Sequence, residues 1–185
     1  MKNALSVLSA LVFLATALPA DAQRYFTRDA NVKFFSDGKM EKIEATNKSG
    51  TAVVDFGTGK MEWKVLIKNF LFEKALMQEH FNENYMESSK YPSASFKGQI
   101  TNLSEVNLNA DGVYPTKVSG KMNIHNVERD VNLEGAITVS AGKISVHSAF
   151  VVKCSDYNIR IEAHKVSNIA NEISVTVNSV LEPLK

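Results

Sequence analysis

The chain of 185 residues contains a single cysteine, Cys154, so no intramolecular disulfide can form. Nothing in the sequence supports an activated thiol, and we predict a small, semi-buried side chain at this position. The chain also lacks an excess of charge of either sign, because its formal net charge is +1. The net charge therefore does not indicate binding to a nucleic acid or to an anionic membrane surface.

Signatures of catalysis and metal binding are missing as well. The histidines are scattered without paired spacing, and His80 with Glu83 on one helix face is only a weak metal signal. There is no G-x-S-x-G nucleophile motif, and Gly57-Thr58-Gly59-Lys60 lacks the spacing of a phosphate-binding loop. We therefore expect no catalytic residues, no metal site, no resident cofactor and no enzyme activity. An enzyme acting on a lipid stays a minor alternative, since it would need converging polar groups in a cavity.

Long hydrophobic runs are absent except at the N-terminus, where the segment Leu5 to Leu18 follows Lys2. This run is short for a membrane span, and Ala20-Asp21-Ala22 matches a signal-peptide cleavage site. We predict a signal peptide over residues 1–22 and one domain over 23–185, exported to the periplasm or secreted from a bacterium. An uncleaved anchor helix is the alternative. No other segment predicts stable membrane insertion.

What the chain does contain is a period-two alternation of apolar and polar residues, which is typical of half-buried strands. Two turn signals, Asn47-Lys48-Ser49-Gly50 and Gly57-Thr58-Gly59-Lys60, predict two hairpins in succession. Residues 156–171 have looser patterning and no assignment. The predicted strands are 25–35, 43–46, 51–56, 61–69, 94–103, 118–124, 131–139, 144–152 and 172–181.

One short helix is predicted at about residues 73–86. Met77, Phe81 and Tyr85 recur at i, i+4 and i+8, and Tyr91-Pro92 ends the helical segment. A single helix beside some eight or nine short strands predicts an all-β barrel or sandwich with a lid.

The predicted inward face combines large side chains with small ones such as Ala94, Gly98, Gly120 and Gly135. Two interpretations of these gaps remain open: strand curvature with close backbone approach, or room for an apolar chain. Burial of one methylene contributes about 0.8 kcal/mol, so a long aliphatic ligand needs no charged anchor.

Several segments, taken in their order along the chain, resemble the YceI-like family, and together they span most of the chain after residue 22. They are His80-Phe81 to Met86 with Tyr91-Pro92-Ser93-Ala94-Ser95-Phe96, Val118 to Val127 with Arg129-Asp130-Val131, Asp156-Tyr157-Asn158-Ile159, and Ile173 to Val177. The resemblance implies an extended, lipocalin-like, eight-stranded antiparallel β-barrel with the helix near its mouth. Some members hold a polyisoprenoid or fatty-acid-like chain inside the barrel. Asn126 stands where the family usually has glycine, and asparagine also tolerates a left-handed conformation.

The resulting hypothesis is a non-enzymatic protein that sequesters or carries a long apolar lipid. The alternative is a structural or interaction protein with a filled barrel, acting through its surface or as a homodimer. The predicted cavity lining is Trp63, Val65, Ile67, Phe96, Met122, Ile124, Leu133 and Phe150, with Phe70, Phe72, Met77 and Phe81 near the mouth. For each of these side chains, core packing is an open alternative to ligand contact.

Overall fold

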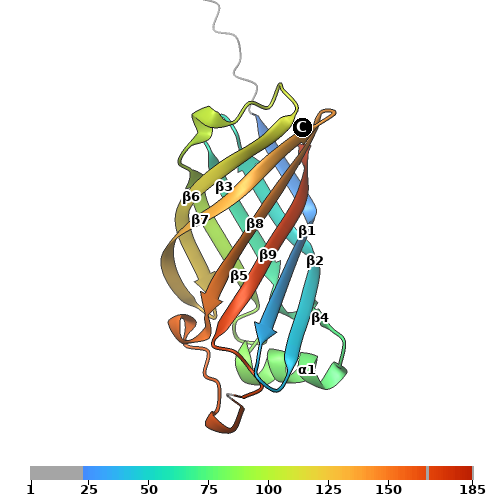
Figure 1. Cartoon of the computed structure of the whole chain (residues 1–185), viewed down its shortest axis with the longest axis vertical. Coiled ribbons are helices and arrows are strands. Elements are labelled where there is room, and N and C mark those ends of the chain that lie inside the picture. Colours follow the sequence, from blue (N-terminus) through green and yellow to red (C-terminus); the bar gives the residue numbers. More distant parts are fainter. Residues whose placement is uncertain (1–22, 166, 185) are drawn as a thin grey trace, which may run out of the picture.

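The computed structural model describes residues 23–165 and 167–184, which form one closed antiparallel barrel (Figure 1). The strand order is β1-β9-β8-β7-β6-β5-β3-β2, and pairing between β1 and β2 closes the ring of eight strands. The predicted barrel is therefore confirmed, and the sandwich alternative is wrong. The predicted signal peptide, residues 1–22, lies outside the described residues.

The strands are β1 (Arg24–Asp37), β2 (Lys42–Asp55), β3 (Lys60–Leu66), β4 (Leu71–Phe72), β5 (Ser93–Ile100), β6 (Gly112–Ile124), β7 (Val127–Ser140), β8 (Lys143–Lys153) and β9 (Glu172–Pro183). The short β4 pairs with β2 outside the ring order. The helical segments are α1 (Ala75–His80), a π-helix η2 (Phe81–Tyr85), and the 3-10 turns η1 (Ile67–Asn69), η3 (Leu103–Glu105), η4 (Cys154–Tyr157) and η5 (Ala163–Lys165).

The helix predicted at about 73–86 is confirmed as α1 followed by η2. The hydrogen bond from Met86 N to Phe81 O, at 2.8 Å, closes the wider π turn. Both elements lie across the lower end of the barrel in Figure 1. This end also holds the β1–β2 turn and the long segment between β8 and β9, where the described part of residues 156–171, left unassigned from sequence, contributes to η4, η5 and irregular chain.

The turn predicted at residues 47–50 is wrong, because β2 continues through it as one strand. Asn47 is fully buried, donates from Nδ2 to Leu66 O at 2.9 Å, and accepts from the Ser49 amide at 2.9 Å. The register against β1 shifts beside Ala30, which marks a bulge. A Cβ on Gly50 would lie 2.9 Å from Ala30 O, so this glycine permits close strand approach. The predicted turn at 57–60 is confirmed between β2 and β3.

Two inward glycines test whether the small inward residues reflect close backbone approach or room for an apolar chain. Gly98 and Gly120 face each other across β5 and β6. A Cβ on Gly98 would lie 2.4 Å from Phe96 Cζ, and one on Gly120 would lie 2.8 Å from the same atom. The Phe96 ring thus occupies the space above both glycines. At these positions the gaps accommodate a neighbouring ring and close backbone approach, and they leave no room for a ligand.

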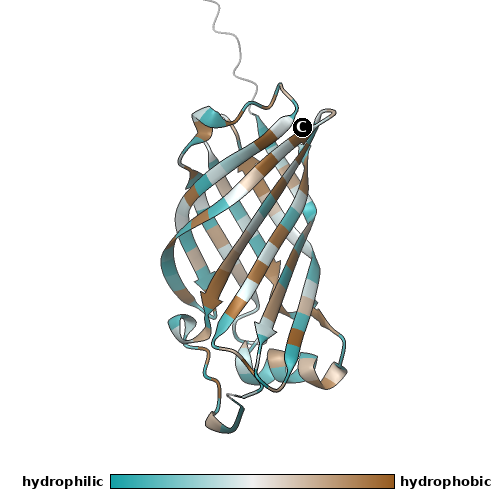
Figure 2. Ribbon diagram, in the orientation of Figure 1, coloured by the Kyte–Doolittle hydropathy of each residue, from teal (hydrophilic) through white to brown (hydrophobic). Residues whose placement is uncertain are grey.

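The interior of the barrel is packed with side chains toward its upper end. A cluster of buried side chains from five strands and their connections fills it: Val54, Phe56, Ile100, Ile137, Val139, Ile144 and Leu181. Figure 2 shows hydrophobic and hydrophilic positions alternating along the strands, as expected where one face points inward. The filled-barrel alternative therefore describes the upper end of the molecule and fails at the lower end.

Candidate ligand cavity

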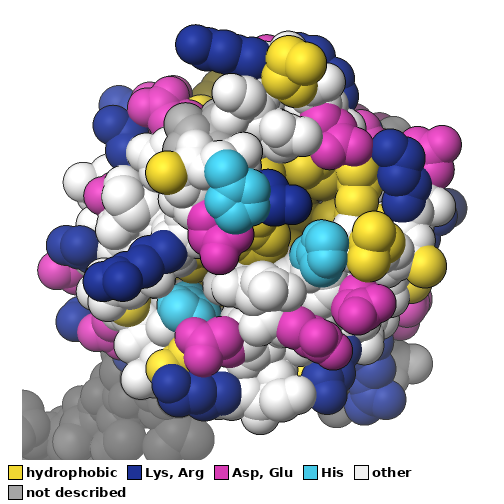
Figure 3. Space-filling model, turned by 90° about the horizontal axis from the view of Figure 1, so that it is seen from below, with side chains coloured by type: hydrophobic (Ala, Val, Ile, Leu, Met, Phe, Trp, Pro, Cys, Tyr) yellow, Lys and Arg dark blue, Asp and Glu magenta, His cyan; other side chains and the backbone are white. Residues whose placement is uncertain are grey.

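A cavity of about 290 Å³ occupies the lower end of the barrel. Figure 3 looks onto this end and shows a hollow floored by hydrophobic side chains, with Lys, Arg, Asp, Glu and His side chains around its edge. We call this opening the mouth. Because the buried cluster fills the upper end, the cavity is a blind pocket within the described chain.

The strand register explains the deep wall of the cavity. Trp63 on β3 pairs with Phe96 on β5, which pairs in turn with Met122 on β6, so the three inward side chains lie side by side. Ala94 pairs with Val65 one step nearer the mouth, and its small side chain leaves space there. The alternation of β3 and β5 predicted that Trp63, Val65, Ala94 and Phe96 face inward, but it did not predict their pairing.

All but one of the predicted site residues line this cavity. The residues brought together are Trp63, Val65, Ile67, Phe70, Phe72, Met77, Phe81, Phe96, Met122, Ile124 and Phe150. Leu133 on β7 does not line it, because it pairs with Val118, which pairs with Ile100 of the upper cluster, so Leu133 lies above the cavity. Ligand contact by the lining residues remains a prediction.

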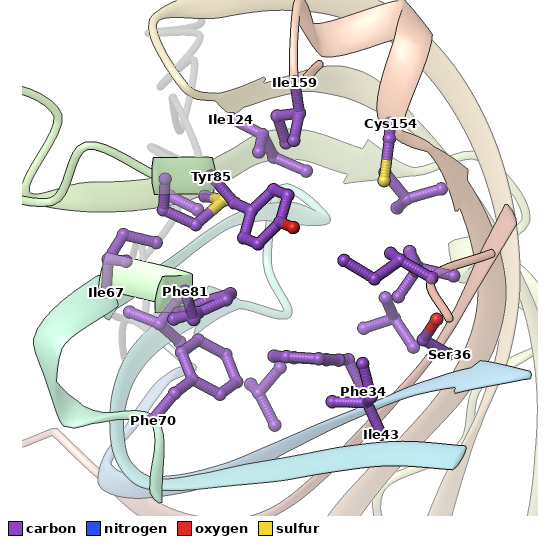
Figure 4. A pocket seen from close by; sticks show the side chains of 18 of the residues that line it. Phe34, Ser36, Ile43, Ile67, Phe70, Phe81, Tyr85, Ile124, Cys154 and Ile159 are labelled. Atoms are coloured by element: carbon purple, nitrogen blue, oxygen red, sulfur yellow. The ribbon is translucent and has the colours of Figure 1, made fainter. Parts of the chain in front are cut away.

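An aromatic cluster joins the helical segment to the barrel. Phe81 on η2 stacks on Phe34 of β1 at 5.3 Å between ring centroids, and it contacts Phe70 and Phe72 at 5.7 and 5.0 Å. The close-up in Figure 4 shows Phe34, Phe70 and Phe81 on one side of the cavity and Tyr85 above them. Such ring pairs contribute about 0.5–1.5 kcal/mol beyond area burial, so the cluster holds α1 and η2 against the wall.

The rest of the wall comes from residues that the sequence-based site prediction missed. β1 and β9 supply Val32, Phe34, Ile173, Val175 and Val177, and β2 supplies Ile43. The alternation of β1 and β9 was a signal that these side chains face inward. The segment between β8 and β9 adds Ile159, Ile161 and Ile169, which the weak pattern there did not reveal.

His125 contacts chain segments that lie next to cavity-lining residues. Its Nδ1 lies 3.2 Å from Tyr157 O, and its Nε2 lies 3.0 Å from Glu87 Oε2, with the Tyr91 ring edge-on at 4.5 Å. His125, Glu87 and Asn126 all have positive φ, at 52°, 42° and 59°. Asn126 thus takes the left-handed conformation expected of it at this turn. The contacts of His125 fix the chain beside the lining residues Ile124, Met86 and Ile159.

Two titratable groups on the cavity wall stay uncharged. Cys154, predicted as a small and semi-buried side chain, is buried, and burial raises the pKa of its thiol to about 11. Burial and, second, the Glu162 carboxylate raise the pKa of the Tyr85 phenol above its usual value. In the described ranges, no cluster of three or more His, Cys, Asp or Glu side chains is placed to hold a metal ion. No helix among the described residues has the length and apolar character needed to cross a membrane.

A closed antiparallel barrel with a one-ended apolar cavity defines the class of lipocalin-like β-barrels. The family model described as the YceI-like domain matches residues 26–181. The chain therefore belongs to the YceI-like family, as its sequence motifs predicted.

Solved structures share this fold at low sequence identity. A polyisoprenoid-binding domain from Saccharophagus degradans, implicated in plant cell wall breakdown, superposes with a TM-score of 0.77 at 13% identity, covering 88% of this chain and 99% of that domain. BcnA from Burkholderia cenocepacia gives 0.69 at 16% identity, covering 83% and 96%. The YceI protein of Campylobacter jejuni gives 0.59 at 18% identity, covering 76% and 84%. No curated protein sequence matches the chain.

Proposed function

We propose that this protein is an exported bacterial binding protein that sequesters or carries a long apolar lipid, either a polyisoprenoid or a fatty-acid-like chain. The observation that carries the proposal is the blind cavity, whose wall is built almost wholly from aliphatic and aromatic side chains and whose opening lies at one end. Export to the periplasm or the medium rests on the N-terminal sequence signal.

The energetics of such a cavity favour an aliphatic ligand. Its volume of about 290 Å³ lies at the small end of the roughly 300–1,000 Å³ typical of ligand pockets. Each methylene that leaves water for this wall contributes about 0.8 kcal/mol, before the costs of ordering the ligand. A chain of ten methylenes therefore gains about 8 kcal/mol gross, without any charged contact inside the barrel.

The same chemistry supports a non-enzymatic role. Ser36, Glu41 and His80 in the lining belong to β1, the β1–β2 turn and α1 at the lower end, while Trp63, Phe96 and Met122 form the deep wall. We propose no catalytic residue and no resident cofactor other than the bound lipid. The likeness to a domain named as polyisoprenoid-binding adds support for a lipid ligand.

The test is native mass spectrometry of the protein purified from a bacterial periplasm, with organic extraction of any bound lipid. We expect a bound lipid, or uptake of added hexadecanoic acid or geranylgeraniol in a one-to-one complex. A clean unliganded mass with no uptake of either compound would overturn the proposal.

A matched pair of variants ties uptake to the cavity. Ala94→Phe places a ring where the wall has its small residue, and it should lower lipid uptake by about tenfold, or ~1.4 kcal/mol. Val151→Phe adds a larger side chain to the same barrel at an outward position that is 58% exposed, and it should leave uptake unchanged. Equal uptake by both variants would show that lipid binds elsewhere.

A further inference from the structure

Three polar side chains of the cavity lining come together on one side of the mouth. They are Ser36 at the end of β1, Lys165 in η5, and Asn168 just beyond it, which we call the donor group. The Ala170 amide donates to Ser36 Oγ at 2.9 Å, and the Asn168 amide donates to Lys165 O at 2.9 Å. The backbone thus holds the end of β1 and the segment after η5 in a fixed relation.

Among the described residues, the charges around the donor group leave Lys165 without an acidic partner. Glu41 is the carboxylate in the cavity lining, and Lys74 neutralises it at 3.1 Å. Glu162 pairs with His164 at 3.4 Å when that histidine is protonated. Within residues 23–165 and 167–184, no carboxylate oxygen lies within 4.0 Å of Lys165 Nζ.

The donor group also has hydrogen bonds to offer. The Ser36 hydroxyl is 2% exposed and accepts from the Ala170 amide, so it positions this segment, and the ammonium of Lys165 and the amide of Asn168 supply the donors. His80 on α1 adds a ring nitrogen at the cavity lining. The ammonium of Lys165, a half-buried residue, attracts an oxyanion more than a neutral group when other donors lie beside it.

We propose that the donor group binds the anionic head group of a single-chain lipid, a carboxylate or a phosphate, whose tail lies in the cavity. This inference rests on the proposed lipid-binding function and names the class of lipid. A charged head cannot enter the apolar interior without a large desolvation penalty, so it stays at the mouth, where Lys165 Nζ compensates its charge. The mouth remains in contact with water, so the attraction weakens as salt rises.

The experiment compares ligands that share one tail and differ only in the head. Dodecanoic acid, dodecyl phosphate and dodecan-1-ol, each below its micellar concentration, displace the neutral dye N-phenyl-1-naphthylamine from the protein at pH 7.5. Each titration is run with wild type, with Lys165→Met, and with Lys117→Met as a control on the exposed outer face of β6. Circular dichroism verifies that all three proteins are folded.

We expect at least one anionic ligand to bind wild type about fivefold more tightly than the alcohol, with the preference falling at 0.5 M salt. Lys165→Met should abolish the preference while leaving alcohol binding unchanged, and Lys117→Met should retain it. The two anionic ligands distinguish a carboxylate head from a phosphate head.

Equal binding of all three heads by wild type, or an unchanged preference in Lys165→Met, would overturn the head-group inference while leaving lipid binding intact. Failure of the dye and of every dodecyl compound to bind wild type would overturn the proposed function and this inference together.

Discussion

Cys154 places its sulfur among the lining side chains, 4.0 Å from Ala170 O and away from water. Burial disfavours the thiolate and raises the pKa of this thiol from 9.0 to about 11. The folded chain therefore holds the proton more tightly than the unfolded chain does. This contribution to stability is fully present below pH 9 and is lost as the pH rises through about 11.

Alkylation measures this state of Cys154. Since the pKa of the Cys154 thiol is about 11, about one thiol in a thousand is ionised at pH 8 in the folded protein. Alkylation reports this fraction, because the thiolate is the reactive form. We expect iodoacetamide to label the native protein at least about a hundredfold more slowly than the protein unfolded in urea, as followed by mass spectrometry. Equal rates would contradict a buried thiol on the cavity wall.

Single residues also show where sequence reasoning is limited. Alternation correctly placed Trp63 and Phe96 on the inner face, because the two-residue period of a strand fixes its side. It could not show that Leu133 lies above the cavity, level with Val118 and Ile100, since facing inward does not determine depth along a barrel. Asn47 looked like a turn residue, but its amide is satisfied across the sheet by Leu66 O.

At the scale of elements, α1 and η2 depend on tertiary packing. α1 has only six residues, shorter than the length at which a helix is stable alone, and its N-cap, Lys74, makes no side-chain capping bond. The rings of Phe34, Phe70 and Phe72 around Phe81 therefore supply much of the stability of this segment.

Removal of the Phe81 ring tests this dependence. Phe81→Ala should destabilise the protein by about 2 kcal/mol in urea unfolding, less than for a fully buried ring because Phe81 is half-buried. It should also increase hydrogen exchange in residues 75–86 more than in the strands. Leu76→Ala on the same helix is the control, because Leu76 is 61% exposed and its loss should change stability by less than about 0.5 kcal/mol. A larger effect of Leu76→Ala would contradict this account.

The periodic elements were predictable because each carries its own pattern, as in the helix with Met77 and Phe81 on one side. The segment between β8 and β9 was not. Its isoleucines are fixed by long-range backbone contacts such as Cys154 N to Asn171 O and Met40 N to Ser167 O, both at 2.8 Å. No local period records such contacts.

At the scale of the whole molecule, packing differs between the two ends. The upper end is filled by the cluster around Val54 and Ile137, whereas the lower end holds the cavity. Barrel closure depends on pairing of β1 with both β2 and β9, which strand patterns alone could not distinguish from a sandwich. The family motifs supplied that distinction.

A hollow lower end predicts that lipid stabilises the fold. A ligand at a hundred times its dissociation constant adds about 2.7 kcal/mol, so the melting temperature should rise by about 5–10 °C. Scanning calorimetry with and without dodecanoic acid measures the shift. Ala94→Phe, with its cavity obstructed, should show little change, and an equal rise in that variant would contradict binding in the cavity.

The packing around Val54 and Ile137 has a consequence for how a ligand enters and leaves the cavity. Within the described residues this cluster closes the upper end, so a lipid that entered tail-first would leave along its entry path past α1, η2 and the segment between β8 and β9. Uptake and release of the proposed lipid would then use the same opening, so a membrane or partner that supplies or accepts the lipid would have to contact the lower end of the barrel.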